Sequence, residues 1–172
     1  MSQRPHVRPP KFADKFALLD FEADPLPVIS MFTPPAPYTL DDVVLRVRGD
    51  DLRTRLLRWG DLSSLPIYEQ HAPIVCQIFN WHEFATWRGV RLVDLIDHFI
   101  FEELAARYLA CHSADGEYFE TLSMEEARDP RTIIAVEMNG EPLQHRYGGP
   151  LRLLVPFLQG YKSVKWLERI HA

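Results

Sequence analysis

Residues 147–170 read "YGGPLRLLVPFLQGYKSVKWLERI" and combine two glycine-containing turns with two apolar runs. The first turn, residues 147–150, leads into the run "LRLLVP", which predicts a strand that carries Arg152. The second turn, residues 160–165, leads into "SVKWLERI", which predicts the last strand. Glycine permits close backbone approach, and exposed N–H groups beside lysine and serine side chains suit a phosphate. By itself the pattern fits either a phosphate-binding loop or a solvent-exposed loop with lysines.

A second informative stretch is "VCQIFNWHEFATWRGVRL", residues 75–92, in which we expect a turn at Trp87-Arg88-Gly89. The apolar run from Ala72 to Phe79 predicts a buried strand that carries Cys76. A cysteine in such a strand is usually a small buried hydrophobe, and the alternative is a thiolate ligand to a soft metal centre. A single cysteine can complete a metal site only if a cofactor already supplies the other ligands of the metal. Cys111 is the other cysteine, and the pair shows neither a disulfide framework nor a zinc spacing.

Composition and charge exclude several classes of protein. The 172 residues, 47% apolar and 25% charged, predict one globular domain. A formal charge of −5 with scattered basic residues argues against a nucleic-acid partner. We see no apolar stretch long enough to cross a membrane and no signal-peptide core, so we expect a cytoplasmic protein, or a periplasmic one if a leader has been removed.

Short strand and helix patterns fill most of the chain. Residues 1–40 hold "RPPKF", "DPLPV" and "TPPAP" and predict an extended, proline-rich arm before a domain at 41–172. Within that domain we expect strands from 43, around the hairpin turn at 115–116 and before the turn at 139–140, with helices after 58, from 92 toward 106 and from 124. The fold class is therefore α+β, a single domain with a mixed β-sheet core and short helices.

Four segments in order resemble the molybdopterin-binding domain of the sulfite oxidase superfamily, which includes the catalytic subunit of a bacterial methionine sulfoxide reductase. They are "LRWGDLSSLP", then "VCQIFNWHEFATWRGVRLVDLI", then "YLACHSADGEYFETLSMEEARDPRTIIAVEMNGEPL", and last "YGGPLRLLVPFLQGYKSVKWLERI". The resemblance spans about residues 43 to 171, and its last segment is the most specific.

The resemblance implies a cofactor and the residues that hold it. In that family a pterin dithiolene holds molybdenum and one protein cysteine completes the metal's ligands, which implies that Cys76 is the metal ligand and catalytic residue. Cys111 matches no family ligand and is expected in the core. The cofactor-binding positions implied by the match are Ser113, Tyr147, Arg152, Ser163, Val164 and Lys165.

Departures from the family bear on the substrate. Sulfite oxidases follow the ligand cysteine with arginines, whereas residues 77–80 here are Gln, Ile, Phe and Asn. The tryptophan that bacterial relatives place four residues after the cysteine stands five residues on, as Trp81. We therefore expect sulfite to be a poor substrate and a neutral S-oxide or N-oxide to fit better, unless Arg88 and Arg91 restore the charge.

The expected function is oxygen-atom transfer to or from a small-molecule substrate, with an external electron-transfer partner and no membrane partner. The haem and dimerisation domains of the eukaryotic enzymes have no counterpart in this sequence. The relatives' aromatic-Arg-Asn-His stretch has no clear match in "VISMFTPPAPYTL". That difference favours the alternative, a non-catalytic molybdopterin-binding or interaction module, whereas the cysteine favours an enzyme.

Overall fold

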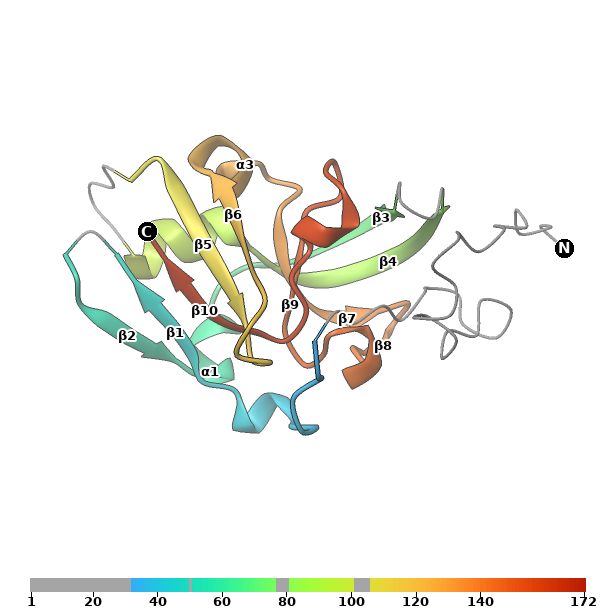
Figure 1. The fold of residues 1–172 in the computed structure, drawn as a ribbon, viewed down its shortest axis with the longest axis horizontal. Helices are drawn as coiled ribbons and strands as arrows, with labels where there is room; N and C mark the ends of the chain where they lie inside the picture. Colours follow the sequence, from blue (N-terminus) through green and yellow to red (C-terminus); the bar gives the residue numbers. More distant parts are fainter. Residues whose placement is uncertain (1–31, 50, 77–80, 101–105) are drawn as a thin grey trace, which may run out of the picture.

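The computed structural model describes residues 32–49, 51–76, 81–100 and 106–172. Two five-stranded sheets with short helices between them form the domain (Figure 1). This confirms the predicted α+β class with a mixed sheet. Most of the predicted arm lies outside the described residues, and its boundary at residue 40 stays a prediction. The first helical turn described is η2 (Leu40–Asp42).

Sheet A has the strand order β2-β1-β10-β5-β6. Its first and last strands in the sequence, β1 and β10, pair in parallel, while the other pairs are antiparallel. This parallel pair makes the sheet mixed, and β10 is its central strand. The strands are β1 (Leu45–Arg48), β2 (Thr54–Leu57), β5 (Tyr108–Ser113), β6 (Phe119–Ser123) and β10 (Leu167–His171).

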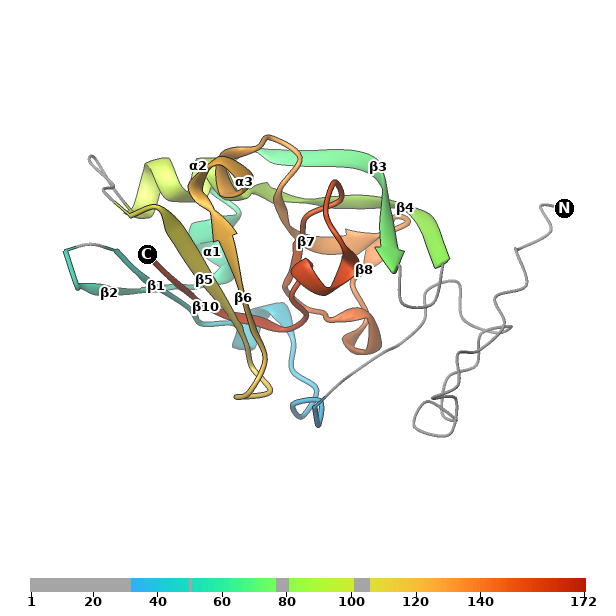
Figure 2. The ribbon, with the colours of Figure 1, turned by 45° about the horizontal axis from the view of Figure 1, so that its top comes forward.

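Sheet B is antiparallel throughout and has the order β3-β4-β7-β8, with β9 also pairing with β7. Its strands β3 and β4 form a long hairpin that projects from the body of the domain, as Figure 2 shows. The strands are β3 (Ile67–Cys76), β4 (Trp81–Arg91), β7 (Ile133–Met138), β8 (Glu141–Pro142) and β9 (Arg152–Leu154).

The helices are short and start where the sequence signals place them. Ser123 accepts a hydrogen bond from the Glu126 amide while Glu126 accepts one from the Ser123 amide, which confirms the predicted capping box. The predicted helix from residue 92 is α2 followed by a π-helical turn. The helical elements are α1 (Trp59–Leu62), α2 (Leu92–Leu95), η3 (Ile96–Ile100), α3 (Met124–Arg128), η4 (His145–Tyr147) and η5 (Gly160–Lys162).

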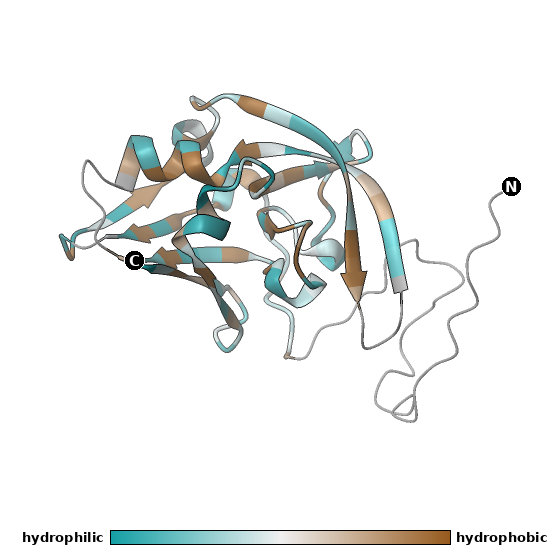
Figure 3. Ribbon diagram, turned by 90° about the horizontal axis from the view of Figure 1, so that it is seen from above, coloured by the Kyte–Doolittle hydropathy of each residue, from teal (hydrophilic) through white to brown (hydrophobic). Residues whose placement is uncertain are grey.

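Two apolar clusters lie on opposite faces of β7 because successive side chains of a strand alternate between faces. Ile134 and Val136 join the main core, which sheet A and α2 also line. Ile133 and Ala135 join a second core with Trp87 and Leu154. Figure 3 shows the apolar and polar residues alternating along several of these strands. Sheet B is thus the middle layer of the domain.

Three local predictions are corrected by this structure. The strand that carries Cys76 begins at Ile67, and only Ala72 and Ile74 within it are buried, because β3 is an edge strand. The segment Trp87–Gly89 is not a turn and lies inside β4, at a register shift against β7. The last strand starts at Leu167 rather than at Ser163, because the residues before it form a loop.

Candidate functional site

One face of sheet B gathers residues from all of its long strands. Strand register puts Ala72 opposite Ala85, and Arg152 of β9 opposite Ala135 of β7. These residues share the face of the second core, to which Trp87 also belongs. Cys76 occupies the same face, because it lies four residues after Ala72 on the strand. The predicted ligand and the predicted phosphate-binding arginine therefore lie on one face of one sheet.

Arg152 is the most unusual charged residue of this face. Its side chain is only 5% exposed, and its guanidinium lies 5.7 Å from the Trp87 ring. One Nη donates a hydrogen bond to the Tyr147 carbonyl at 2.8 Å, while the buried Nε has no hydrogen-bond partner within the described residues. Burial lowers the pKa of Arg152 to about 10, and no described carboxylate forms an ion pair with it. A buried cation without a counter-charge is costly and suits a bound anion.

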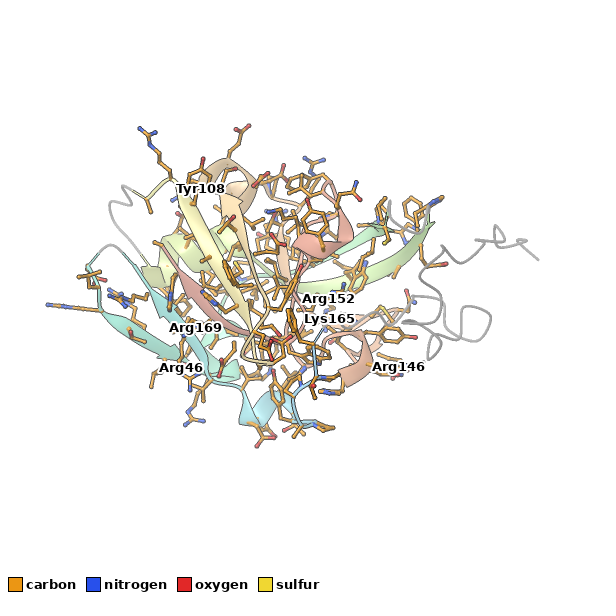
Figure 4. The ribbon with its side chains drawn as sticks, viewed as in Figure 1. Arg46, Tyr108, Arg146, Arg152, Lys165 and Arg169 are labelled. Carbon is orange, nitrogen blue, oxygen red and sulfur yellow. The ribbon has the colours of Figure 1, made fainter. Side chains whose placement is uncertain are left out.

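Lys165 adds a second cation beside Arg152, and Figure 4 shows the two close together at the centre of the molecule. Burial and the nearby charge of Arg152 lower the pKa of Lys165 to about 7. The Lys165 side chain packs over Gly148, where an added Cβ would come within 2.7 Å of the Lys165 Cβ and Cγ. Gly148 also has a φ of 93°, so a side chain there would be both crowded and strained. The Lys165 side chain can therefore pack in this position only because residue 148 is a glycine.

Trp166 fixes the loop that presents Lys165. Its backbone has a φ of 49°, a left-handed conformation that a bulky residue rarely adopts. Its amide donates to the Gly148 carbonyl at 2.9 Å, and its indole Nε1 donates to the His145 carbonyl at 2.8 Å. Because strained residues persist only where their surroundings hold them, the loop from Ser163 to Trp166 is rigidly defined.

The end of β3 that bears Cys76 lies against the second glycine loop. A Cβ added to Gly160 would come within 2.9 Å of both the Ile74 Cγ2 and the Val75 carbonyl oxygen. Only glycine allows this approach, so η5 and the end of β3 are in direct contact. Cys76 is a free, half-buried cysteine. Cys111, in contrast, is fully buried in the main core, as predicted, and burial raises its pKa to about 12.

The other predicted cofactor-binding residues are buried and their polar groups are partly used inside the protein. The Ser163 hydroxyl accepts from the Val155 amide at 3.0 Å, and Ser113 accepts from the Asp115 amide at 3.2 Å. Val164 is fully buried, and its carbonyl accepts from the Leu153 amide. Their exposed fractions are 4% for Ser163, 0% for Val164, 1% for Ser113 and 3% for Tyr147. These residues order the loops, and the Ser163 and Ser113 hydroxyls can also act as hydrogen-bond donors.

Four further charged residues near Cys76 in sequence separate into different environments. Glu83 pairs with Ile74 across the hairpin and so shares the Cys76 face, whereas His82 is exposed on the other face. Arg88 forms an ion pair with Glu137, and the Arg91 guanidinium stacks 3.5 Å over the Tyr68 ring. The arginines are thus held by partners away from Cys76. Residues 77–80, on which the sulfite prediction rests, lie outside the described residues.

Sequence reasoning missed the supporting residues of the site. Trp87 was read as part of a turn, but its indole Nε1 donates to the Ala72 carbonyl at 3.2 Å and its ring lies under Arg152. The available signal was the run of strand-favouring residues Phe84, Thr86 and Trp87, which is typical of a strand but does not show which face is buried. The contact between Gly160 and Val75 joins distant segments and has no local sequence signal.

Comparison with known proteins bears on the family of this chain. The family model described as oxidoreductase molybdopterin binding domain matches residues 32–172. The methionine-sulfoxide reductase catalytic subunit MsrP of Gluconobacter oxydans is 30% identical over 164 residues, which are 87% of this chain and 51% of that protein. The mitochondrial sulfite oxidase of Drosophila melanogaster is 36% identical over 155 residues, 76% of this chain and 27% of that one.

A solved structure shows the same fold. The sulfane dehydrogenase SoxCD from Paracoccus pantotrophus superposes with a TM-score of 0.73 at 18% identity, covering 97% of this chain and 53% of that one. The chain therefore spans about half of the length of that structure and of the bacterial relative. In the described residues, none of the helices has the length and apolar character needed to cross a membrane. The match over most of its length shows that this chain belongs to the oxidoreductase molybdopterin binding domain family.

Proposed function

We propose that this chain binds molybdenum as its molybdopterin complex and transfers an oxygen atom to or from a small neutral substrate, an S-oxide or an N-oxide. The observation that carries the proposal is the buried Arg152, which has an unpartnered Nε and no ion pair among the described residues, on the same sheet face as Cys76. An anionic, metal-bearing ligand that spans the two residues would satisfy both. Family membership supplies the identity of that ligand.

Each residue of the site has a distinct role in this proposal. Arg152 and Lys165 hold the phosphate end of the cofactor, because both are cationic and largely removed from water. Ser163, Val164, Tyr147 and Ser113 shape the loops and offer hydroxyl or backbone groups to the pterin. The Cys76 thiolate is the protein's ligand to the metal. The bound cofactor supplies a two-electron centre that gains or loses one oxygen atom, while the protein orients it.

The charge around Cys76 favours a neutral substrate over sulfite. Arg88 forms an ion pair with Glu137, and Arg91, which keeps its charge, stacks on Tyr68, eight residues before Cys76 on β3. Glu83 adds a carboxylate on the Cys76 face. A small dianion would meet repulsion there, since like charges a few ångströms apart cost several kcal/mol at a partly buried site. The relative named as a methionine-sulfoxide reductase supports the same substrate class.

The reaction also requires an external electron-transfer partner, because removing an oxygen atom from an S-oxide consumes two electrons. We assign the domain to the cytoplasm, or to the periplasm if a leader has been removed. Fractionation of cells that express the full gene product tests this assignment.

The proposal is tested first by measuring how much molybdenum cofactor the protein binds and then by measuring the rate of substrate reduction. We expect protein from a cofactor-producing host to contain about one molybdenum per chain, and to reduce methionine sulfoxide or trimethylamine N-oxide with a reduced viologen dye. Cys111→Ala is the control for Cys76→Ser, because Cys111 is not proposed as a ligand and alanine adds no polar group to the core. Full molybdenum with no turnover of any oxide would instead support the non-catalytic module. Absence of metal, or efficient oxidation of sulfite, would contradict the proposal.

A further inference from the structure

The face of sheet A that points away from the core carries an ordered row of side chains. Strand register aligns one outward residue from each of the five strands, and the next outward residues form a second row. The inward residues of the three central strands, Val47, Ile170 and Cys111, are fully buried in the main core. The first row reads Leu56, Arg46, Arg169, His112 and Phe119, and the second reads Thr54, Arg48, His171, Ala110 and Thr121.

This outward face is positively charged although the chain as a whole carries −5. Arg46, Arg48 and Arg169 belong to the two rows, and the outward register positions include no carboxylate. Glu168, at the register shift of β10, forms an ion pair with Arg46. Within the part of the chain that the structure describes, it is the one acid that forms an ion pair with the three arginines of the rows. The buried Nε of Arg169 has no hydrogen-bond partner within the described residues.

Exposed apolar and aromatic side chains lie at the edges of this charged face. Leu56 and Phe119, at the two ends of the first row, are 61% and 54% exposed, and Tyr108 on the same face is 61% exposed. His112 stacks on Phe119 at 5.2 Å and lies 5.2 Å from His171. Arginine and aromatic residues are enriched in protein interfaces, where the apolar groups gain most when covered. Figure 4 shows Arg46, Arg169 and Tyr108 over sheet A, apart from Arg152 and Lys165.

The first row also lies next to the candidate cofactor site. His112 is outward, and the following residue, Ser113, is inward and buried. Ser113 pairs with Leu167, and the Ala114 amide donates to the Trp166 carbonyl at 2.8 Å, directly after Lys165 in the chain. A group docked over His112 and Arg169 therefore lies on the opposite side of sheet A from Ser113, one of the predicted cofactor-binding residues.

We propose that the outward face of sheet A, centred on Arg46, Arg169, His112 and Phe119, docks an acidic protein electron carrier. This inference rests on the proposed function, which needs an external carrier. The face is positively charged although the whole chain is negative, so it attracts anionic surfaces. Charge complementarity therefore favours an acidic carrier over a basic one.

The electron balance of the coupled reaction is fixed by the substrate. Reduction of one sulfoxide to its sulfide breaks the S–O bond, consumes two electrons and two protons, and releases one water. Two one-electron carriers are oxidised for each sulfoxide reduced. In the opposite direction the carriers accept the two electrons, and water supplies the oxygen atom with release of two protons.

The test uses the cofactor-loaded full chain and flavodoxin, an acidic one-electron carrier, with plant-type ferredoxin as a second acidic carrier. Binding of the oxidised carriers is measured by calorimetry at low ionic strength, which does not depend on turnover. We expect Arg46→Glu combined with Arg169→Glu to weaken binding about tenfold or more. The same variant should lower kcat/KM with reduced flavodoxin and leave the viologen-linked rate unchanged.

Arg128→Glu is the matched control. Arg128 is 41% exposed at its side chain and pairs with Asp97, whereas Arg46 is 46% exposed and pairs with Glu168. A second test variant, Arg46→Glu with Arg48→Glu, avoids the partly buried Arg169. Molybdenum content and the viologen-linked rate report folding of every variant.

Three results would overturn the inference. The first is absence of binding by both acidic carriers. The second is equal loss of binding in Arg128→Glu. The third is occupation of this face by a second copy of the chain or by nucleic acid, detected by sedimentation and by titration with a DNA oligonucleotide. Loss of the viologen-linked rate in the wild type would instead count against the proposed function, and the binding data would stand separately.

Discussion

The two cationic regions of this domain differ in how far they are removed from water. Arg152 is 5% exposed, has an unpartnered Nε and lies beside Lys165, a second cation. Arg46 keeps 46% of its side chain exposed and is paired with Glu168. A charge in water is stabilised by the solvent, so an ion pair with any one partner contributes little free energy and the partner can be exchanged. A buried charge has lost that solvent, and it therefore demands one specific ligand.

The comparison predicts that the same substitution has opposite consequences in the two regions. In the buried region, loss of charge should weaken ligand binding and remove the desolvation cost of the charge from the empty protein. In the exposed region, it should change association rates and little else. The following experiments test this contrast.

Replacement of Cys76 by serine should have the largest effect, because it removes the proposed thiolate ligand of the buried region. We expect loss of catalytic turnover and of the thiolate-to-metal absorption, with the fold retained because sulfur and oxygen differ little in volume. Absorption spectra, metal content and circular dichroism measure these outcomes. Turnover at the wild-type rate would show that the metal is not held by this residue.

Arg152→Met should lower cofactor affinity about tenfold to hundredfold, since a charge-assisted hydrogen bond contributes about 1.5–3 kcal/mol. The cofactor-free variant should unfold at a higher denaturant concentration than wild type, because an unpaired buried charge is replaced by an apolar chain of similar length. Arg46→Met is the control and should shift stability by no more than about 0.5 kcal/mol. Equal stability changes in the two variants would contradict the proposed difference between the buried Arg152 and the exposed Arg46.

The pH dependence of the cofactor-free protein should reveal Lys165, whose pKa is lowered to about 7 in the folded state. An unfolded chain keeps a lysine protonated up to a pKa of about 10.4. Between these values the unfolded state binds more protons, so the free energy of unfolding rises with pH through this window, by at most about 1.4 kcal/mol per unit. The penalty is fully present below pH 7. Denaturation of Lys165→Met across this range should lack the slope that wild type shows.

Glu168→Gln should produce the smallest effect, in the exposed region. Removing the carboxylate that pairs with Arg46 increases the positive charge of the face. We expect a rise of a few fold in the association rate with flavodoxin at low salt, which disappears near physiological ionic strength because the Debye length is then about 8 Å. Stopped-flow mixing at two salt concentrations measures it. A slower association in the variant would mean that Glu168 itself contacts the carrier.

The sequence predicted the features that depend on local chemistry. The Asp115–Gly116 hairpin and the Ser123 cap were confirmed because turn and cap preferences act within a few residues. The family resemblance, which the family model confirms, supplied the cofactor. The placement of Arg152 over Trp87 was not predicted, because it joins strands that are distant in sequence.

Burial was the property that sequence patterns misjudged most. The run that carries Cys76 is apolar and was expected to be fully buried, yet β3 is an edge strand and only alternate residues are covered. Strand order depends on all of the pairings at once, so a single apolar run does not reveal whether it lies at the centre or the edge of a sheet. The outward rows of sheet A likewise became visible only from the register across five strands.

The parallel pairing of β1 with β10 has a consequence during protein synthesis. The strand at the centre of sheet A is synthesised after the other four strands of that sheet, so β1 and β5 lack their shared neighbour until residues 167–171 emerge. Contacts between such distant segments fold slowly and leave strand edges exposed in the meantime. The loop that bears Lys165 immediately precedes β10. A nascent chain therefore acquires the loop proposed to bind phosphate and the central strand together, so the cofactor can be held in this way only after residues 163–171 have been made.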